Sequence, residues 1–197
     1  MFLSIPASVA LVIGSEQIIS ALFGYGSFTK NSVLNSSNAL YYFGLGLPAF
    51  ALIKVFSTFF FANNDTKTPF YISLVSVLLN ILISVYFFKN IGFIIIPIAT
   101  TISSWFNSLI LFVCLKNNDL FEFNEIFFKK FVKIVFASIM MGLFFDYLIL
   151  FFENQLSHAF FFKSAYLILC VFLTIFFYLT ISYFIKAFNY DDIKIKY

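Results

Sequence analysis

Five polar side chains inside long apolar stretches are the strongest candidates for chemistry in this sequence: Lys54, Thr58, Asn80, Thr100 and Ser104. An ammonium group attracts anions, whereas amide and hydroxyl oxygens coordinate cations or polar headgroups. A lysine inside a membrane costs about 2.5–3.5 kcal/mol on insertion scales, so Lys54 should face a cavity, pair with an acid or extend to the membrane surface. These residues predict a polar-lined cavity rather than a reactive centre.

Each candidate belongs to a stripe of small or polar residues at spacings of three and four, which places the stripe on one face of a helix. The stripes are Gly44, Pro48, Ala51, Lys54 and Thr58; Ser73, Ser76, Asn80 and Ser84; and Pro97, Thr100 and Ser104 with Asn107 or Ser108. For any single serine, close packing and hydrogen bonding between helices explains the pattern better. Three consecutive stripes favour a shared, hydrated cavity.

The elements that must carry these residues are long apolar runs. Hydrophobic residues make up 62% of the 197 residues and charged residues 11%, whereas a soluble domain is about 45–50% apolar. Lipid offers open sheet edges no hydrogen-bond partners, and a helix crosses a bilayer in about 20 residues. The fold class we expect is all-α: a single transmembrane domain, a bundle of about six helices. The expected spans are 2–23, 39–61, 70–88, 92–115, 131–152 and 162–185.

A short polar segment, Ala62–Pro69, separates two of these runs and predicts a tight turn at the membrane surface. Asp65 or Thr68 can cap the helix that follows, and Pro69 suits a first helical turn, where a backbone N–H is not needed. We therefore interpret Asp65, Thr68 and Pro69 as structural residues of the turn.

Lysine placement predicts the orientation, because positive residues concentrate on the cytoplasmic side. With six spans, eight lysines share the side of the termini and three lie on the other side. The first group is Lys67, Lys116, Lys129, Lys130, Lys133, Lys186, Lys194 and Lys196; the second is Lys30, Lys89 and Lys163. Both termini of this multi-pass membrane protein are therefore expected in the cytoplasm.

The chain divides by character into cavity-lining helices, 1–115, and a remainder, 116–197. In the remainder, the segment 116–130 mixes charges with Phe, Leu and Ile, which is typical of an amphipathic helix in the headgroup region; a plain anchored loop is the alternative. The last two spans are almost uniformly Phe, Leu and Ile. They predict a peripheral helix pair in contact with lipid.

Other function classes lack the residues they need. The sequence has no glycine-rich phosphate loop and no spaced metal ligands, and its single histidine, His158, has no nucleophile set to complete. A basic, aromatic-interleaved surface for nucleic acid is missing as well. Cys114 and Cys170 lie in apolar runs without disulfide or metal spacing. We expect a transport or lipid-handling protein, not an enzyme, with no nucleic-acid partner and no firm metal site.

Several short motifs follow one another in a fairly specific order: Phe23-Gly24-Tyr25-Gly26-Ser27-Phe28-Thr29, then Tyr42-Phe43-Gly44-Leu45, Lys54-Val55, Ala62–Pro69, Asn80, and Gly92 with Ala99-Thr100. In this order the chain resembles the lipid II flippases of the MurJ/MviN type, within the multidrug/oligosaccharidyl-lipid/polysaccharide exporter superfamily. The match covers most of the first four expected spans. The span count and orientation resemble the last six of that family's fourteen helices, its C-terminal lobe.

The resemblance implies translocation of an undecaprenyl-linked peptidoglycan precursor across the inner membrane by alternating access, without chemical conversion, for cell-wall synthesis. The arginine cluster that binds the pyrophosphate in this family lies in its N-terminal part, and this sequence contains no arginine. Headgroup recognition therefore cannot be carried over. The last two spans resemble the pair that forms a groove for the prenyl tail.

The resemblance also implies a candidate cation site, because some family members bind sodium where Asn80 and Thr100 stand. Ser84 occupies the place of an expected carboxylate, which departs from that pattern. We expect no organic cofactor; a sodium ion or the membrane potential is the candidate driving force.

The resulting hypothesis is a truncated or split flippase that works only beside a chain carrying the first eight spans. Its partners would be the lipid-linked precursor, membrane lipids and that second chain. Two alternatives remain open: another exporter of the same superfamily, for polysaccharide-linked lipids or drugs, and a structural membrane subunit without transport.

Overall fold

Long helices build the chain, as the apolar runs predict. The computed structural model describes residues 1–118, 125–156 and 162–187. His158, Lys194, Lys196 and the middle of the expected interfacial segment lie outside the described residues. The helices are α1 (Ser4–Ile13), α2 (Ser15–Phe23), α3 (Lys30–Ala62), α4 (Lys67–Ile91), η1 (Gly92–Ile94), α5 (Ile95–Asn117), α6 (Glu125–Phe151), α7 (Glu153–Leu156) and α8 (Lys163–Phe184).

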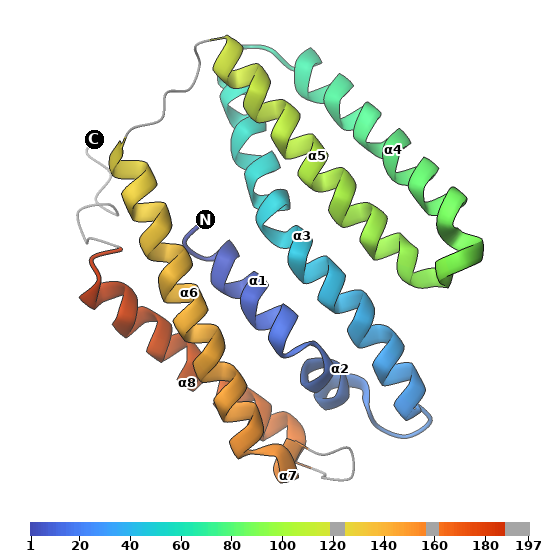
Figure 1. The fold of residues 1–197 in the computed structure, drawn as a ribbon, viewed down its shortest axis with the longest axis vertical. Helices are drawn as coiled ribbons and strands as arrows, with labels where there is room; N and C mark the ends of the chain where they lie inside the picture. Colours follow the sequence, from blue (N-terminus) through green and yellow to red (C-terminus); the bar gives the residue numbers. More distant parts are fainter. Residues whose placement is uncertain (119–124, 157–161, 188–197) are drawn as a thin grey trace. The chain divides into compact units, whose positions relative to one another are not determined.

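Four helical segments of the described chain are long and apolar enough to cross a membrane, or five if the bent pair α1–α2 counts as one span. One of the four, Lys67–Asn117, contains both α4 and α5. The run reverses at Gly92, whose positive φ of 76° favours glycine, and α4 and α5 then lie side by side (Figure 1). The expected all-helical membrane bundle is confirmed.

The first apolar run, expected as one span, is two helices that meet at an angle of 76°. Gly14 lies at the bend, and a Cβ built on it would be only 2.5 Å from Cε1 of Phe145 on α6. The ring of Phe145 therefore occupies the space that a side chain at position 14 would need. A hydrophobicity count cannot reveal this close contact, because Phe145 lies on another helix.

The chain folds into two compact units, Met1–Ser37 with Phe123–Tyr197, and Asn38–Glu122. We call them unit 1 and unit 2. The boundary expected at 115/116 concerned which helices line a cavity, and it stays a prediction. In unit 1 the first helix packs against α6 and the second against α8.

The core of unit 1 is apolar and closely packed. One cluster gathers Phe145, Leu148, Ile149, Leu167 and Cys170 with other side chains around them. Gly142 on α6 lets α1 approach so closely that a Cβ there would lie 2.6 Å from Cγ1 of Val9. Close approach at small residues is the usual basis of helix packing in lipid, where no hydrophobic force holds helices together.

Unit 1 also contains a lysine that the sequence analysis counted on the outer side, at the start of the sixth expected span. Lys163, the first residue of α8, is fully buried, and its Nζ donates to the carbonyl of Gly24, 2.7 Å away. Its ammonium lies 4.3 Å from the centre of the Tyr25 ring, a cation–π distance. Ser164 donates to the carbonyl of Ala21 at 2.6 Å. Lysine and serine together thus bind the C-terminal end of α2, where backbone carbonyls have no partner within the helix.

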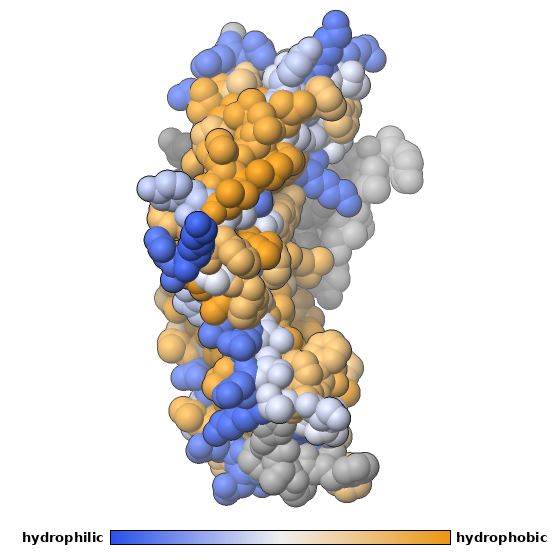
Figure 2. All heavy atoms as spheres, turned by 90° about the vertical axis from the view of Figure 1, so that its right-hand side faces the viewer, coloured by the Kyte–Doolittle hydropathy of each residue, from blue (hydrophilic) through white to orange (hydrophobic). Residues whose placement is uncertain are grey.

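In unit 2 the ends of α3 and α5 and the start of α4 share an apolar cluster of Phe56, Phe60, Ile72, Leu111 and Leu115. The opposite face of α4 is exposed and apolar: Leu82, Val85 and Tyr86 are at least 70% exposed. Figure 2, which faces α4, shows this apolar surface lying between polar residues at both ends. Such a surface suits lipid tails or another apolar helix.

Candidate functional site

The central polar contact of unit 2 joins α4 to α5 through Asn80. Its Nδ2 donates to Oγ1 of Thr100 at 3.1 Å and to Oγ of Ser103 at 3.2 Å. On the other side of the amide, Ser84 donates to Oδ1 of Asn80 at 3.4 Å. The predicted residues Asn80 and Thr100 are therefore brought together, and Ser103 and Ser84 complete a four-residue cluster.

The hydroxyl groups of Thr100 and Ser103 donate their hydrogens to backbone carbonyls of α5. Thr100 donates to the carbonyl of Ile96 at 2.8 Å, and Ser103 donates to the carbonyl of Thr100 at 3.0 Å. A hydroxyl carries one donor hydrogen, so both oxygens can only accept from Asn80. This requires the NH₂ group of Asn80, and not its oxygen, to face them.

That requirement bears on the candidate cation site. A cation needs several oxygens directed at one point, and carboxylates are its strongest protein ligands. Here the amide NH₂ lies against the two hydroxyl oxygens, and neither α4 nor α5 contains Asp or Glu. As arranged, the residues do not fit a bound cation.

Ser104, the third predicted residue of this region, is buried and donates to the carbonyl of Thr100 at 2.6 Å. One turn further along α5, the Nδ2 of Asn107 donates to Ser73 on α4 at 3.4 Å. The Oδ1 of Asn107 is buried without a hydrogen-bond partner. The polar stripes of α4 and α5 thus meet along their contact.

Lys54 and Thr58 are exposed on α3, and Thr58 donates to the carbonyl of Lys54 at 2.8 Å. Within the described residues no hydrogen bond joins them to Asn80, Thr100 or Ser104. Lys54 stands eight residues before the end of α3, which is about 12 Å at 1.5 Å per residue. Its cavity-facing role stays a prediction.

Two residues that the sequence analysis did not select connect α5 to α3. Thr101 donates to the carbonyl of Tyr42 at 2.6 Å, and Nε1 of Trp105 donates to the carbonyl of Leu45 at 3.1 Å. A Cβ at Gly46 would lie 2.9 Å from Oγ1 of Thr101, so this approach needs glycine. We call this contact the α3–α5 clamp.

The clamp sits beside Pro48, which lies inside α3. Proline has no N–H and its ring crowds the carbonyl four residues earlier, which bends helices. Side-chain donors of a neighbouring helix can bind backbone carbonyls close to such a proline. The Gly44–Gly46–Pro48 pattern indicated that α3 is unusual here, but it did not identify which α5 side chains donate to its backbone carbonyls.

The polar turn between α3 and α4 is ordered by its own side chains. Asn64 adopts a positive φ of 58°, and the N–H groups of Asp65 and Asn64 donate to the carbonyls of Phe60 and Phe61, which is a Schellman motif. Oδ1 of Asp65 accepts from the N–H groups of Lys67 and Thr68, both at 3.0 Å. The hydroxyl of Thr68, these N–H groups and the charge of Lys67 lower the pKa of Asp65. Pro69 is buried in the first turn of α4.

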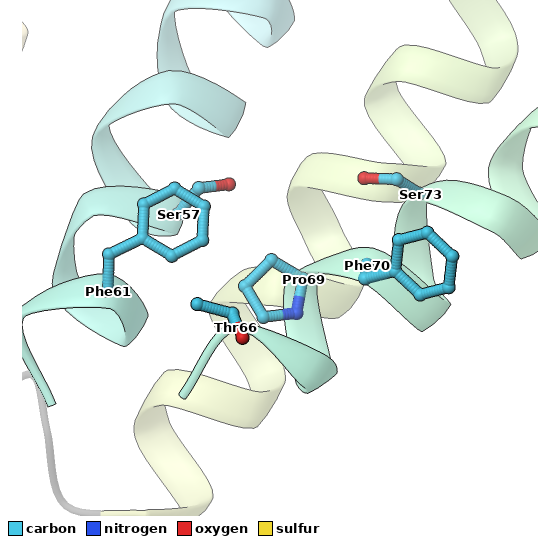
Figure 3. A pocket seen from close by; sticks show the side chains of 6 residues that line it. All are labelled: Ser57, Phe61, Thr66, Pro69, Phe70 and Ser73. Atoms are coloured by element: carbon cyan, nitrogen blue, oxygen red, sulfur yellow. The ribbon is translucent and has the colours of Figure 1, made fainter. Parts of the chain in front are cut away.

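A groove of about 430 Å³ lies at this turn, lined by Ser57, Phe61, Thr66, Pro69, Phe70 and Ser73. The hydroxyls of Ser57 on α3 and Ser73 on α4 point toward each other across it (Figure 3). Apart from them the groove is largely apolar, so it can admit an apolar chain with one polar group.

With this geometry in hand, comparisons with known proteins identify relatives. The sequence profile of the family described as "Lipid II flippase MurJ" matches residues 1–186. A probable lipid II flippase MurJ of Rhizobium meliloti is 39% identical over 115 residues, 58% of this chain and 22% of that protein. A probable lipid II flippase MurJ of Buchnera aphidicola subsp. Schizaphis graminum is 27% identical over 98% of this chain and 38% of its own length.

The fold agrees with the sequence comparison. A solved structure of a lipid II flippase MurJ in an inward closed conformation matches with a TM-score of 0.75 and 27% identity, covering 94% of this chain and 36% of that one. The chain thus spans roughly a fifth to two fifths of the length of these relatives. Because the profile match covers nearly the whole chain and the fold agrees, this chain belongs to the MurJ lipid II flippase family.

Proposed function

We propose that this chain forms part of a flippase that moves a lipid-linked peptidoglycan precursor across the bacterial inner membrane by alternating access, without chemical conversion of the precursor. The observation that carries the proposal is the family match over residues 1–186. The structural match over 94% of the chain supports it. The chain would supply the C-terminal lobe.

The remainder of such a flippase would have to come from a second chain or from a longer polypeptide, because this chain spans at most 38% of the relatives described above. One observation supports this incompleteness: no arginine is present to bind a pyrophosphate. We propose that the missing portion supplies the headgroup-binding residues.

The orientation belongs to the same proposal: both termini in the cytoplasm, with the Asn64–Asp65 turn on the same side. The asymmetric lysine distribution supports it. In a variant lacking Cys114 and Cys170, a cysteine at Asn64 should react with a membrane-impermeant maleimide only after the membrane is opened. A cysteine at Ser27 should react in intact cells. The reverse pattern would contradict the orientation.

The decisive experiment is complementation. In a bacterium depleted of its own flippase, this chain is produced alone and fused to the N-terminal portion of a relative, and outward exposure of the labelled precursor is measured. We expect flipping by the fusion only. A fusion that reaches the membrane at the level of the intact relative and flips nothing would contradict the proposal. Export of a different lipid-linked sugar would favour another exporter of the superfamily.

Lys54 provides the sharpest variant within that assay. If its ammonium faces the translocated anion, Lys54→Ala should slow flipping about tenfold, equivalent to ~1.4 kcal/mol, while Lys54→Arg keeps the charge and most of the rate. Lys89→Ala, in the last turn of α4, removes an exposed lysine outside the predicted cavity and is the matched control. Unchanged flipping by Lys54→Ala would contradict the cavity-facing role of Lys54.

A further inference from the structure

We propose that Asn80, Ser84, Thr100 and Ser103 form a neutral joint in which the NH₂ group of Asn80 takes the position of a monovalent cation. The contact between α4 and α5 in this chain then does not depend on sodium. The family resemblance implies a sodium site here, and the arrangement of these four side chains disagrees with it.

The first step is the direction of the hydroxyl lone pairs. Thr100 and Ser103 donate their hydrogens to the carbonyls of Ile96 and Thr100, which leaves lone pairs of both oxygens directed at one point. The NH₂ group of Asn80 lies at that point, 3.1 and 3.2 Å from the two oxygens. Its two partially positive hydrogens satisfy both lone pairs, as a small cation would.

The second step is the role of Ser84, which determines which way the amide faces. A serine hydroxyl can donate to Oδ1 of Asn80, and it does so at 3.4 Å. A carboxylate at position 84 could not donate. It would repel Oδ1 and attract NH₂, so the amide would turn over and place its oxygen beside Thr100 and Ser103. Three oxygens and a carboxylate would then converge, which is a set that a cation can use.

The third step is charge. The only carboxylate among residues 38–118, the described part of unit 2, is Asp65, which already accepts from the N–H groups of Lys67 and Thr68. It lies 15 residues before Asn80, about 22 Å along the helix. Within the described part of unit 2, a cation at the joint would have only neutral oxygens around it, in a region of low dielectric where an uncompensated charge is costly.

The test compares thermal unfolding of the purified full-length chain in sodium, potassium and choline chloride at equal ionic strength. The wild-type chain and Ser84→Asn should unfold at the same temperature in all three salts. The asparagine is the matched control because it has the size of aspartate and can still donate to Oδ1. Ser84→Asp should gain a sodium-specific rise of roughly 2–4 °C, as expected for a ligand that binds only the folded state.

Sodium-specific stabilisation of the wild-type chain that disappears in Thr100→Val would overturn the proposal. A folded Ser84→Asp with no response to sodium would overturn the role given to Ser84. If Ser84→Asp does not fold, the wild-type and Thr100→Val measurements still decide between a neutral joint and a cation site. None of these measurements requires flipping, so the result is independent of the proposed function.

Discussion

The contacts of α6 in unit 1 and those of α5 in unit 2 use different chemistry. In unit 2, amide, hydroxyl and indole groups reach from one helix to the next, as in the contacts of Asn80 with Thr100 and of Trp105 with Leu45. In unit 1, α6 meets α1 through missing side chains at Gly14 and Gly142, and it meets α8 through stacked rings of Phe144 and Phe177, 4.2 Å apart.

This difference matters because lipid is as apolar as the side chains it surrounds. Contacts of shape and ring stacking hold helices together but tolerate small rotations. A hydrogen bond between two specific groups restricts how one helix can rotate or slide against the other. The hydrogen-bonded contacts of α5 therefore specify geometry more narrowly than the contacts of α6, and they lie in unit 2, which also carries every residue predicted for the candidate site.

The largest effect is expected in unit 1, where space is the limiting quantity. Gly142→Val should lower the free energy of unfolding by about 1–3 kcal/mol, because Val9 and Ile13 already occupy the space a side chain needs. Adding Val9→Ala to Gly142→Val should restore part of the loss, measured by denaturant unfolding in detergent. Strictly additive losses in the double variant would show that shape does not limit this contact.

Asn80→Leu should rank second, with a loss of about 1–2 kcal/mol for two hydrogen bonds between helices. The loss stays moderate because Thr100 and Ser103 keep their backbone acceptors, and only the hydroxyl of Ser84 loses its acceptor, Oδ1 of Asn80. Asn90→Leu, an exposed change on the same helix, is the control and should cost close to nothing. Equal losses in the free energy of unfolding for the two variants would contradict the role given to hydrogen bonds in the contacts of α5.

Thr101→Val should cost about 0.5–1.5 kcal/mol, since it removes one hydrogen bond to Tyr42 and changes little in shape. Trp105→Phe removes the other bond of the α3–α5 clamp. If the clamp restrains the helix around Pro48, the double variant should lose more stability than the sum of the two single losses. Spin-label distances across that proline would then broaden in the double variant and stay narrow in Asn90→Leu.

The smallest effect concerns Asp65, which is partly exposed at the turn. Its pKa is lowered from about 3.8, so its stabilisation is complete above that value and disappears as pH falls through the lower folded-state pKa. The gap in unfolding temperature between wild type and Asp65→Ala should be constant from pH 7 to about pH 5 and shrink below pH 4. Asp65→Asn keeps an acceptor that does not titrate and should respond less to acid. A difference in unfolding temperature that widens in acid would contradict the capping role of the Asp65 carboxylate.

The sequence predicted the helical membrane fold and placed Asn80 and Thr100 on facing stripes, because both follow from apolar length and from spacing along one helix. It did not reveal Thr101 or Trp105, since their acceptors are backbone carbonyls on another helix, those of Tyr42 and Leu45. Nor did it reveal the break at Gly14 or the burial of Lys163. Each of these depends on a partner distant in the sequence: Phe145 for Gly14, and Gly24 for Lys163.

The bond between Lys163 and Gly24 has a consequence for the order of assembly, because 139 residues separate its partners. At a synthesis rate of about 5–20 residues per second, the end of α2 waits roughly 7–28 s for the lysine that binds it. During that interval the bent helix pair α1–α2 lacks the hydrogen bond from Lys163 to Gly24. The later helix α8 thus completes the end of α2, and this contact forms only after the 139 residues between its partners have been synthesised.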